Sequence, residues 1–129
     1  MVVDTSAIVA VLVDEPDAER FARLIEATPA PAISAVTRVE LTFVVEGRKG
    51  EPGRVRLERF LEDGGFRIVP VTPTQAEIAC EAFRCFGKGR HPAALNIGDC
   101  FAYALARESG EALLFKGNDF GRTDVTSAA

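Results

Sequence analysis

Four acidic residues stand where an α/β fold could bring them together: Asp4, Glu40, Asp99 and Asp119. Asp4 directly follows a short β-branched stretch, and Asp119 follows the apolar run 112–115. Glu40 and Asp99 each fall in the first turns of a predicted helix. Because strand ends and the starts of the following helices share one edge of a parallel sheet, we expect these carboxylates to meet in one cleft.

A cluster of carboxylates is stable mainly around a cation, because like charges at short range disfavour joint ionisation. All-oxygen ligands suit Mg²⁺, with Mn²⁺ as a substitute. An ion held in this way can activate a water molecule and stabilise the charge that develops on a phosphodiester. The acids therefore predict a divalent-metal site with hydrolytic chemistry.

Three of the acids also have a purely structural alternative. Asp99 can cap its helix, and Glu40 can close a Thr-x-x-Glu capping box with Thr37. Asp119 can belong to an Asn-Asp turn. The spacing of the residues leaves these alternatives open.

The remaining reactive residues exclude several other kinds of site. The one histidine, His91, rules out a zinc site with several imidazoles, and we expect it at the surface or in contact with substrate. Cys80, Cys85 and Cys100 form no CxxC motif, so we expect them to be reduced and buried. The chain has no GxxxxGK[ST] motif, and no GxGxxG follows a strand, so the usual nucleotide-binding fingerprints are absent.

The composition fits a single soluble domain over residues 1–129, with 47% hydrophobic and 26% charged residues. No apolar run reaches the roughly 18 residues needed to cross a bilayer. The N-terminus lacks the basic region of a signal peptide, so we predict a cytoplasmic protein without membrane association. The net charge of −4 is unusual for a nucleic-acid binder, but a bound cation can offset acids at the point of contact.

The elements that must position the acids alternate along the chain. Strands are predicted at 2–3, 32–34, 66–71 and 112–115, with a short fifth strand near Val125. Helices are predicted at 7–13, after Asp17, from Ser34 or Thr37 to the stretch 47–50, from Pro52 to Gly64, from Thr72 to Gly87 and from Asp99 to Gly110. Thr5 or Ser6 is predicted to cap the first helix. This order predicts an α/β fold with a parallel sheet and the first strand in its middle.

Several blocks of the sequence, taken in order, resemble one known family. They are Val-Val-Asp4-Thr5-Ser6-Ala, Glu40 in a helix, Asn96-Ile-Gly98-Asp99-Cys100-Phe-Ala-Tyr-Ala-Leu-Ala and Leu-Leu-Phe-Lys-Gly117-Asn118-Asp119-Phe120. Together they are similar to the PIN-domain ribonucleases, specifically the VapC-type toxins of bacterial type II toxin–antitoxin pairs. The resemblance covers essentially the whole chain, and its last two blocks are the specific ones.

The resemblance implies a PIN-like three-layer fold, in which helices flank a central parallel sheet of about five strands. It also implies a Mg²⁺-dependent endoribonuclease acting on RNA, neutralised by a small cognate antitoxin, and a homodimer. Asp4 and Asp99 would be the main metal ligands, with Glu40 completing the acidic centre. Asp119 would be the fourth catalytic acid, although many relatives carry an acid at the position of Asn118.

Further roles follow for neighbouring residues. The side chains expected to orient ligands or water are Thr5, Ser6, Asn96 and Asn118. Three cations are expected to contact flanking phosphates: Lys88, Arg90 and Lys116. The alternative is that they are only solvated surface charges.

Two rival functions remain: a PIN-like module that grips RNA or a protein without cutting, and a small metal-dependent phosphatase. The acids favour cutting, since a module that only bound RNA would gain nothing from repelling its phosphates. Asp4-Thr5-Ser6 also lacks the second acid, two residues on, that a phosphatase with an aspartyl nucleophile would have.

Overall fold

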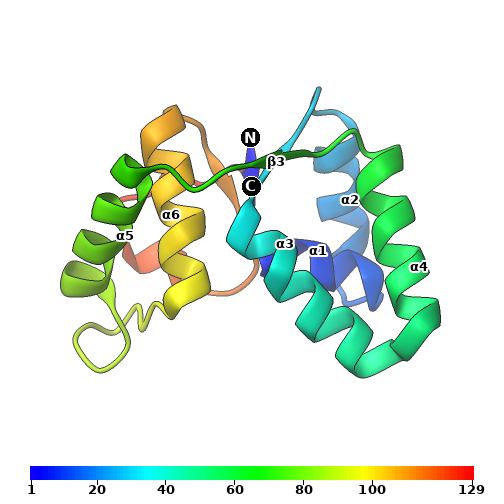
Figure 1. Cartoon of the computed structure of the whole chain (residues 1–129), viewed down its shortest axis with the longest axis horizontal. Helices are drawn as coiled ribbons and strands as arrows, with labels where there is room; N and C mark the ends of the chain where they lie inside the picture. Colours follow the sequence, from blue (N-terminus) through cyan, green and yellow to red (C-terminus); the bar gives the residue numbers. More distant parts are fainter.

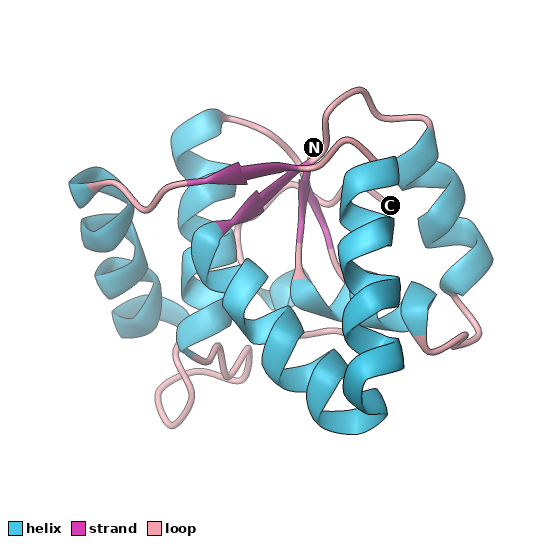
Figure 2. Ribbon diagram, turned by 45° about the vertical axis from the view of Figure 1, so that its right-hand side comes forward, coloured by secondary structure: helices cyan, strands magenta, loops and turns pink.

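The computed structural model describes all 129 residues as an α/β fold with a parallel sheet (Figure 1 and Figure 2). The sheet order is β3-β2-β1-β4, made by β1 (Val2–Val3), β2 (Ala32–Ser34), β3 (Arg67–Val69) and β4 (Leu113–Leu114). Val2 pairs with Ala32 on one side and with Leu113 on the other. The predicted fold class and the inner position of the first strand are therefore confirmed.

The sheet has four strands, where about five were expected. The C-terminal segment forms only an isolated parallel bridge between Leu113 and Ser127. Two backbone hydrogen bonds hold it beside β4: the N–H of Leu113 donates to Thr126 O at 2.8 Å, and the N–H of Ala128 donates to Leu113 O at 2.9 Å. The segment near Val125 thus lies at the sheet edge without becoming a strand.

Helices cover both faces of the sheet. They are α1 (Thr5–Leu12), α2 (Ala18–Glu26), α3 (Ala35–Leu41), the π-helical turn η1 (Thr42–Glu46), α4 (Gly47–Asp63), α5 (Pro73–Phe86), α6 (Ile97–Ser109) and the 3-10 turn η2 (Phe120–Arg122). In Figure 1, α5 and α6 lie on one side of the sheet, and α1, α2 and α4 lie on the other. This arrangement gives three layers.

Each face of the sheet has its own hydrophobic core, because successive side chains of a strand point to opposite faces. Val2 belongs to the core that also contains Ala79 of α5 and Leu105 of α6. Val3, the next residue, packs in the second core with Ile8 of α1 and Leu57 of α4. The two β-branched residues before Asp4 therefore anchor it from both sides.

Two expectations about local structure are wrong, namely the cap of the first helix and the burial of all three cysteines, and one is confirmed. The first helix begins at Thr5 because Asp4, and neither Thr5 nor Ser6, caps it. The helix capped by Ser34 runs through η1 and is broken at Gly50, where φ is +62°, so the predicted end within the stretch 47–50 and the new helix after it are confirmed. Cys80 and Cys85 are exposed, because their side chains lie on the solvent-facing sides of α5, and only Cys100 is buried.

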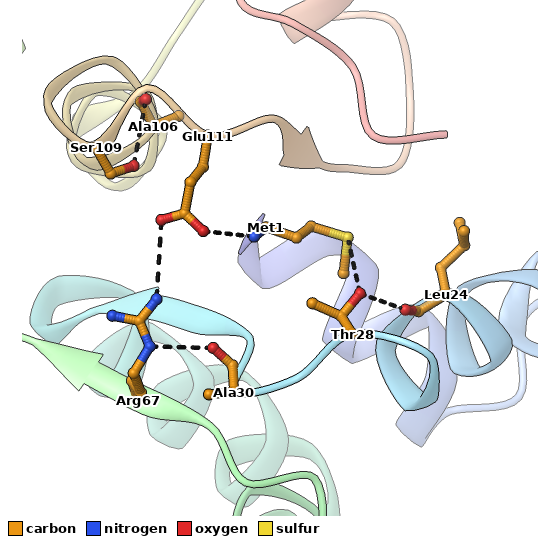
Figure 3. Close-up of polar contacts among 8 residues, drawn as sticks. All are labelled: Met1, Leu24, Thr28, Ala30, Arg67, Ala106, Ser109 and Glu111. Carbon is orange, nitrogen blue, oxygen red and sulfur yellow. Dashed lines mark hydrogen bonds and ion pairs between the residues drawn. The ribbon is translucent and has the colours of Figure 1, made fainter.

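Polar contacts join the segments at the amino ends of the strands, opposite the carboxyl end of β1 that Asp4 follows (Figure 3). The amino group of Met1 donates to Glu111 Oε1 at 2.6 Å, and Arg67 lies 3.8 Å from Glu111 Oε2. Arg67 Nε also donates to Ala30 O at 3.1 Å. These contacts fix the start of β1 relative to the segments around it.

None of the helices combines the length with the apolar composition that a membrane span requires. The cytoplasmic location expected from the sequence stays a prediction.

Candidate active site at the carboxyl edge of the sheet

Asp4 lies where β1 ends and α1 begins, and it is 3% exposed. Its Oδ2 accepts hydrogen bonds from the backbone N–H of Ser6 at 3.0 Å and from the Ser6 hydroxyl at 2.6 Å. Its Oδ1 is buried and has no hydrogen-bond partner. A buried carboxylate oxygen without a donor is unfavourable, so Asp4 retains an unmet capacity to bind a hydrogen-bond donor or a cation.

Glu40 reaches the same region from α3. Thr5 Oγ1 donates to Glu40 Oε1 at 2.8 Å, which links the start of α1 to α3. The alternative in which Glu40 closes a capping box with Thr37 is wrong: Ser34 caps α3, and the buried Thr37 hydroxyl has no partner. The side chain of Glu40 is therefore directed toward β1 and α1, away from the N-terminus of its own helix.

Asp99 lies in the first turn of α6 and takes part in a reciprocal capping box. Asn96 Oδ1 accepts from the N–H of Asp99 at 2.9 Å, and Asp99 Oδ2 accepts from the N–H of Asn96 at 3.0 Å. Asp99 thus helps to cap its helix, as the structural alternative predicts. This does not exclude a role in the site, because one carboxylate can cap a helix and still face a cleft.

These three acids line one open cleft of about 490 Å³, together with residues of both neighbouring helices and of the segment after β4. The lining residues are Asp4, Thr5, Ser6, Val9, Glu15, Glu40, Val44, Arg48, Asn96, Asp99, Lys116 and Gly117. The predicted convergence of Asp4, Glu40 and Asp99 is therefore observed. Three predicted neighbours, Thr5, Ser6 and Asn96, hydrogen-bond one acid each.

Sequence reasoning missed Glu15 and Arg48, both of which line the cleft. Glu15 forms an ion pair with Lys116 at the cleft rim. The backbone N–H of Lys116 also donates to the Ser6 hydroxyl at 3.0 Å, which continues the hydrogen-bond chain to Asp4. No pattern in the sequence distinguishes Glu15 from other surface acids, because the contact spans about a hundred residues.

Burial raises the pKa of all three acids, and nearby negative charges add to the shift. Desolvation is the largest cause in each case. For Asp99, burial and the neighbouring charges of Asp4 and Glu40 raise the pKa to about 7, against the hydrogen bond from the Asn96 N–H, which lowers it. The pKa of Glu40 is raised by burial and by the charge of Asp4, although the Thr5 hydroxyl opposes the shift. The cleft therefore holds three carboxyl groups whose ionised forms are disfavoured.

Asp119 and Asn118 are exposed and do not line the cleft. Asp119 precedes η2 and makes no capping hydrogen bond with its side chain. The turn begins at Gly117, where φ is +93°, and only Lys116 and Gly117 of this turn reach the cleft. The charge of Asp119 nevertheless raises the pKa of Asp4 and of Asp99, so it lies within electrostatic range.

Lys88 and Arg90 lie in the loop before α6 and are exposed. They line a separate apolar groove of about 610 Å³, which shares only Asn96 with the acidic cleft. The guanidinium of Arg90 lies over the Phe83 ring, 5.0 Å from its centroid. His91 in the same loop accepts a hydrogen bond from the Ala93 N–H at 3.0 Å, so its ring shapes the loop locally.

No group of three or more histidine, cysteine, aspartate or glutamate side chains is arranged closely enough to form a ready-made metal site. The carboxylates share a cleft without sharing a single point in it. The donor set itself, all carboxylate oxygen with one buried oxygen unpartnered, suits a hard divalent cation.

The PIN domain family model matches residues 1–125. The chain belongs to the PIN-domain family. This PIN domain is 50% identical over 129 residues to Ribonuclease VapC30 of Mycobacterium tuberculosis, a match that covers 100% of this chain and 98% of the relative. It is 48% identical over 127 residues to Ribonuclease VapC of Mycolicibacterium smegmatis, covering 98% of each. The VapC-type resemblance is thereby confirmed.

Solved structures share the fold of this PIN domain. VapC20 of Mycobacterium tuberculosis, described as a Sarcin-Ricin loop cleaving toxin, matches with a TM-score of 0.78 at 20% identity over 98% of this chain and 97% of that one. The DNA-bound VapBC of Salmonella typhimurium matches with a TM-score of 0.75 at 18% identity, covering 98% and 93%. These likenesses confirm the layered α/β architecture.

Proposed function

We propose that this PIN domain is a Mg²⁺-dependent endoribonuclease toxin that hydrolyses RNA at the cleft lined by Asp4, Glu40 and Asp99. The observation that carries the proposal is the convergence of three carboxylates in one open cleft, one from the residue after β1 and one each from α3 and α6. The names of the full-length relatives, which are VapC ribonucleases, support the same activity.

Asp4, Asp99 and Glu40 are the residues that would hold Mg²⁺, or Mn²⁺ in its place. Two features support this assignment: Asp4 Oδ1 is buried without a partner, and the pKa of each acid is raised by burial and neighbouring charge. A cation offsets both effects. Since no three ligating side chains meet at one point here, binding requires at least one of these carboxylates to rotate.

When bound, the ion supplies a water of lowered pKa and offsets charge on the scissile phosphodiester. The protein supplies the orientation. Ser6 holds Asp4 through its hydroxyl and its backbone N–H, and Thr5 holds Glu40 through its hydroxyl. The capping box with Asn96 fixes Asp99. These partners direct the three carboxylates into the cleft, from which a rotation of at least one of them would complete the ligand set.

Lys116 is placed to contact a substrate phosphate at the rim of the cleft, where its ammonium pairs with Glu15. Lys88 and Arg90 are too far around the surface to line the cleft, and any phosphate they contact would belong to a flanking nucleotide. We propose this division between one cation at the cleft and two beyond it.

The test is incubation of the purified protein with a pool of structured RNA in Mg²⁺, in Mn²⁺ or in excess EDTA. Cleavage is expected with either metal and should stop in EDTA. A phosphatase would release phosphate from a monoester under the same conditions without cutting internal bonds. A pure binding module would retard RNA in a gel without cutting it, so either result would contradict the proposal.

We also propose a small antitoxin that lays an apolar helix against this chain and directs an Arg or Lys toward Asp4 and Asp99. Solved relatives described as toxin–antitoxin or VapBC complexes support such a partner. Growth arrest on expression alone, relieved by co-expression of an adjacent small reading frame, is the expected result. Absence of toxicity together with absence of such a frame would count against it.

A homodimer is a further proposal. Two large apolar side chains are conspicuously exposed for a monomer, Phe43 at 76% and Ile97 at 75%. Sedimentation equilibrium is expected to give twice the mass of one chain, and Phe43→Ser is expected to shift the mass toward the monomer. A monomer at all concentrations would contradict the proposal.

A further inference from the structure

We propose that Gly98 is a positioning residue for Glu40, because the missing side chain leaves the space in which the Glu40 carboxylate lies. Gly98 is buried in the first turn of α6, next to Asp99. A Cβ built on it would come closer than 3.0 Å to Cδ, Oε1 and Oε2 of Glu40, a separation that real Cβ atoms essentially never show. The carboxyl group of Glu40 therefore lies directly against the backbone of α6.

Backbone geometry does not explain the glycine. The glycines with positive φ are Gly50, Gly65, Gly89, Gly110 and Gly117, and Gly98 is not one of them. Inside a helix, alanine is ordinarily the more stable residue, because glycine loses more conformational entropy on folding. What requires glycine at position 98 is therefore the absence of a Cβ, because the Glu40 carboxyl group occupies the place where a Cβ would lie.

The kind of atom that would be displaced matters. At Gly87, a Cβ would overlap the backbone oxygen of Phe83 and its ring, so a substitution there would disturb the fold. At Gly98, all three nearest atoms belong to the end of one flexible side chain. Glu40 is only half-buried and can turn away. A methyl group at 98 is therefore expected to move Glu40 and to leave the fold intact.

The displacement would undo the arrangement of Glu40 in the cleft. The carboxylate lies between the backbone of Gly98 and the Thr5 hydroxyl, which donates to Oε1 at 2.8 Å. Pushing the group away from α6 breaks this hydrogen bond or turns Oε1 and Oε2 out of the cleft that Asp99 also lines. Misplacing a catalytic group by about 1 Å can lower the rate about 100-fold.

The experiment compares Gly98→Ala, Glu40→Ala, the double variant and a matched control, Gly47→Ala. Gly47 has helical dihedrals, and nothing lies within 4 Å of a Cβ at that position. Three quantities are measured: the thermal unfolding midpoint in EDTA, its rise in millimolar Mg²⁺, and kcat and KM for RNA cleavage. The effect on catalysis rests on the proposed function, whereas the unfolding midpoints test the contact itself.

In the Glu40→Ala background, Gly98→Ala is expected to raise the midpoint by about 2–4 °C, as Gly47→Ala does in the wild type, because only helix propensity then acts. In the wild-type background, Gly98→Ala is expected to gain less, since the lost contacts of Glu40 offset propensity. It should also weaken the Mg²⁺-induced rise. We expect kcat to fall about 100-fold with KM within about twofold, and the double variant to be no slower than Glu40→Ala.

Four outcomes would overturn the proposal. They are full activity of Gly98→Ala, additive losses of kcat in the double variant, equal midpoint shifts from Gly98→Ala in both backgrounds, and unfolding of the double variant. If the wild type cleaves no RNA, the nuclease proposal fails, but the two midpoint shifts still decide whether Gly98 positions Glu40.

Discussion

The hydroxyl of Ser6 links Asp4 to the backbone after β4, so its removal should lower the stability of the protein by a predictable amount. It donates to Asp4 Oδ2 at 2.6 Å and accepts from the Lys116 N–H at 3.0 Å. Ser6→Ala deletes both hydrogen bonds but keeps the bond from the Ser6 backbone N–H to Asp4. The variant therefore loosens Asp4 without removing its helix cap.

The expected loss of stability can be worked out from these contacts. A hydrogen bond to a charged group contributes about 1.5–3 kcal/mol and an ordinary one about 1 kcal/mol. Because Ser6 is half-buried, the lower end of this range applies, which gives about 2.5 kcal/mol for the two bonds together. The better helix propensity of alanine offsets about 0.5 kcal/mol, so roughly 2 kcal/mol of stability is lost. With an unfolding entropy of about 2.1 cal/mol/K for each of 129 residues, the midpoint should fall by about 7 °C.

The assay is thermal unfolding in EDTA, followed by circular dichroism. Ser109→Ala is the control, because Ser109 lies at the C-terminal end of α6, outside the cleft, where its hydroxyl donates to Ala106 O at 3.4 Å. The control should stay within about 0.5 kcal/mol of the wild type. If Ser6→Ala is no less stable than Ser109→Ala, the hydrogen-bond chain from Lys116 to Asp4 does not hold the site together.

Two more predictions concern charge. In EDTA, Asp99 has a pKa of about 7 in the folded protein against an ordinary 3.8, so the folded state binds more protons between these values. The free energy of unfolding, measured with urea, should fall as pH rises through this window, and Asp99→Asn should flatten the slope; a rise with pH would contradict the reasoning. Lys116→Met should weaken RNA binding and reduce the slope of log K against log salt by about 0.7, whereas Arg59→Met, on the exposed face of α4, should leave both unchanged. Equal effects of the two variants would remove Lys116 from the substrate contacts.

The position of Asp4 could be predicted because it depends on short-range rules. Two β-branched residues predict a short inner strand, and the small hydroxyl residues after the acid predict a helix start, although Asp4 itself is the cap. Asp99 was also placed at the start of its helix, because a nearly continuous apolar run follows it, although α6 begins two residues earlier, at Ile97, with Asn96 as its cap. Parallel topology then places strand ends and helix starts at one edge of the sheet. Local pattern and topology were thus sufficient to predict three of the acids in one cleft.

Features that depend on exact side-chain contacts could not be predicted. The pairing of Glu15 with Lys116 and the packing of Glu40 against Gly98 join residues far apart in the chain, with no local signal. The exposure of Cys80 depends on which face of α5 packs against α6, and several faces of this helix carry apolar residues. Asp119 follows β4 as expected, but the turn at Gly117 leaves it outside the cleft.

The central claim is that Asp4 and Asp99 make RNA cleavage depend on a metal ion, and one measurement tests it most directly. RNA cleavage by the wild type, Asp4→Asn and Asp99→Asn is compared in the same Mg²⁺ buffer, after circular dichroism has shown that all three are folded. An amide keeps the acceptor that caps the helix but is a poor ligand for a hard cation. We predict a loss of at least about 100-fold in each variant. Full activity in either variant would contradict the account.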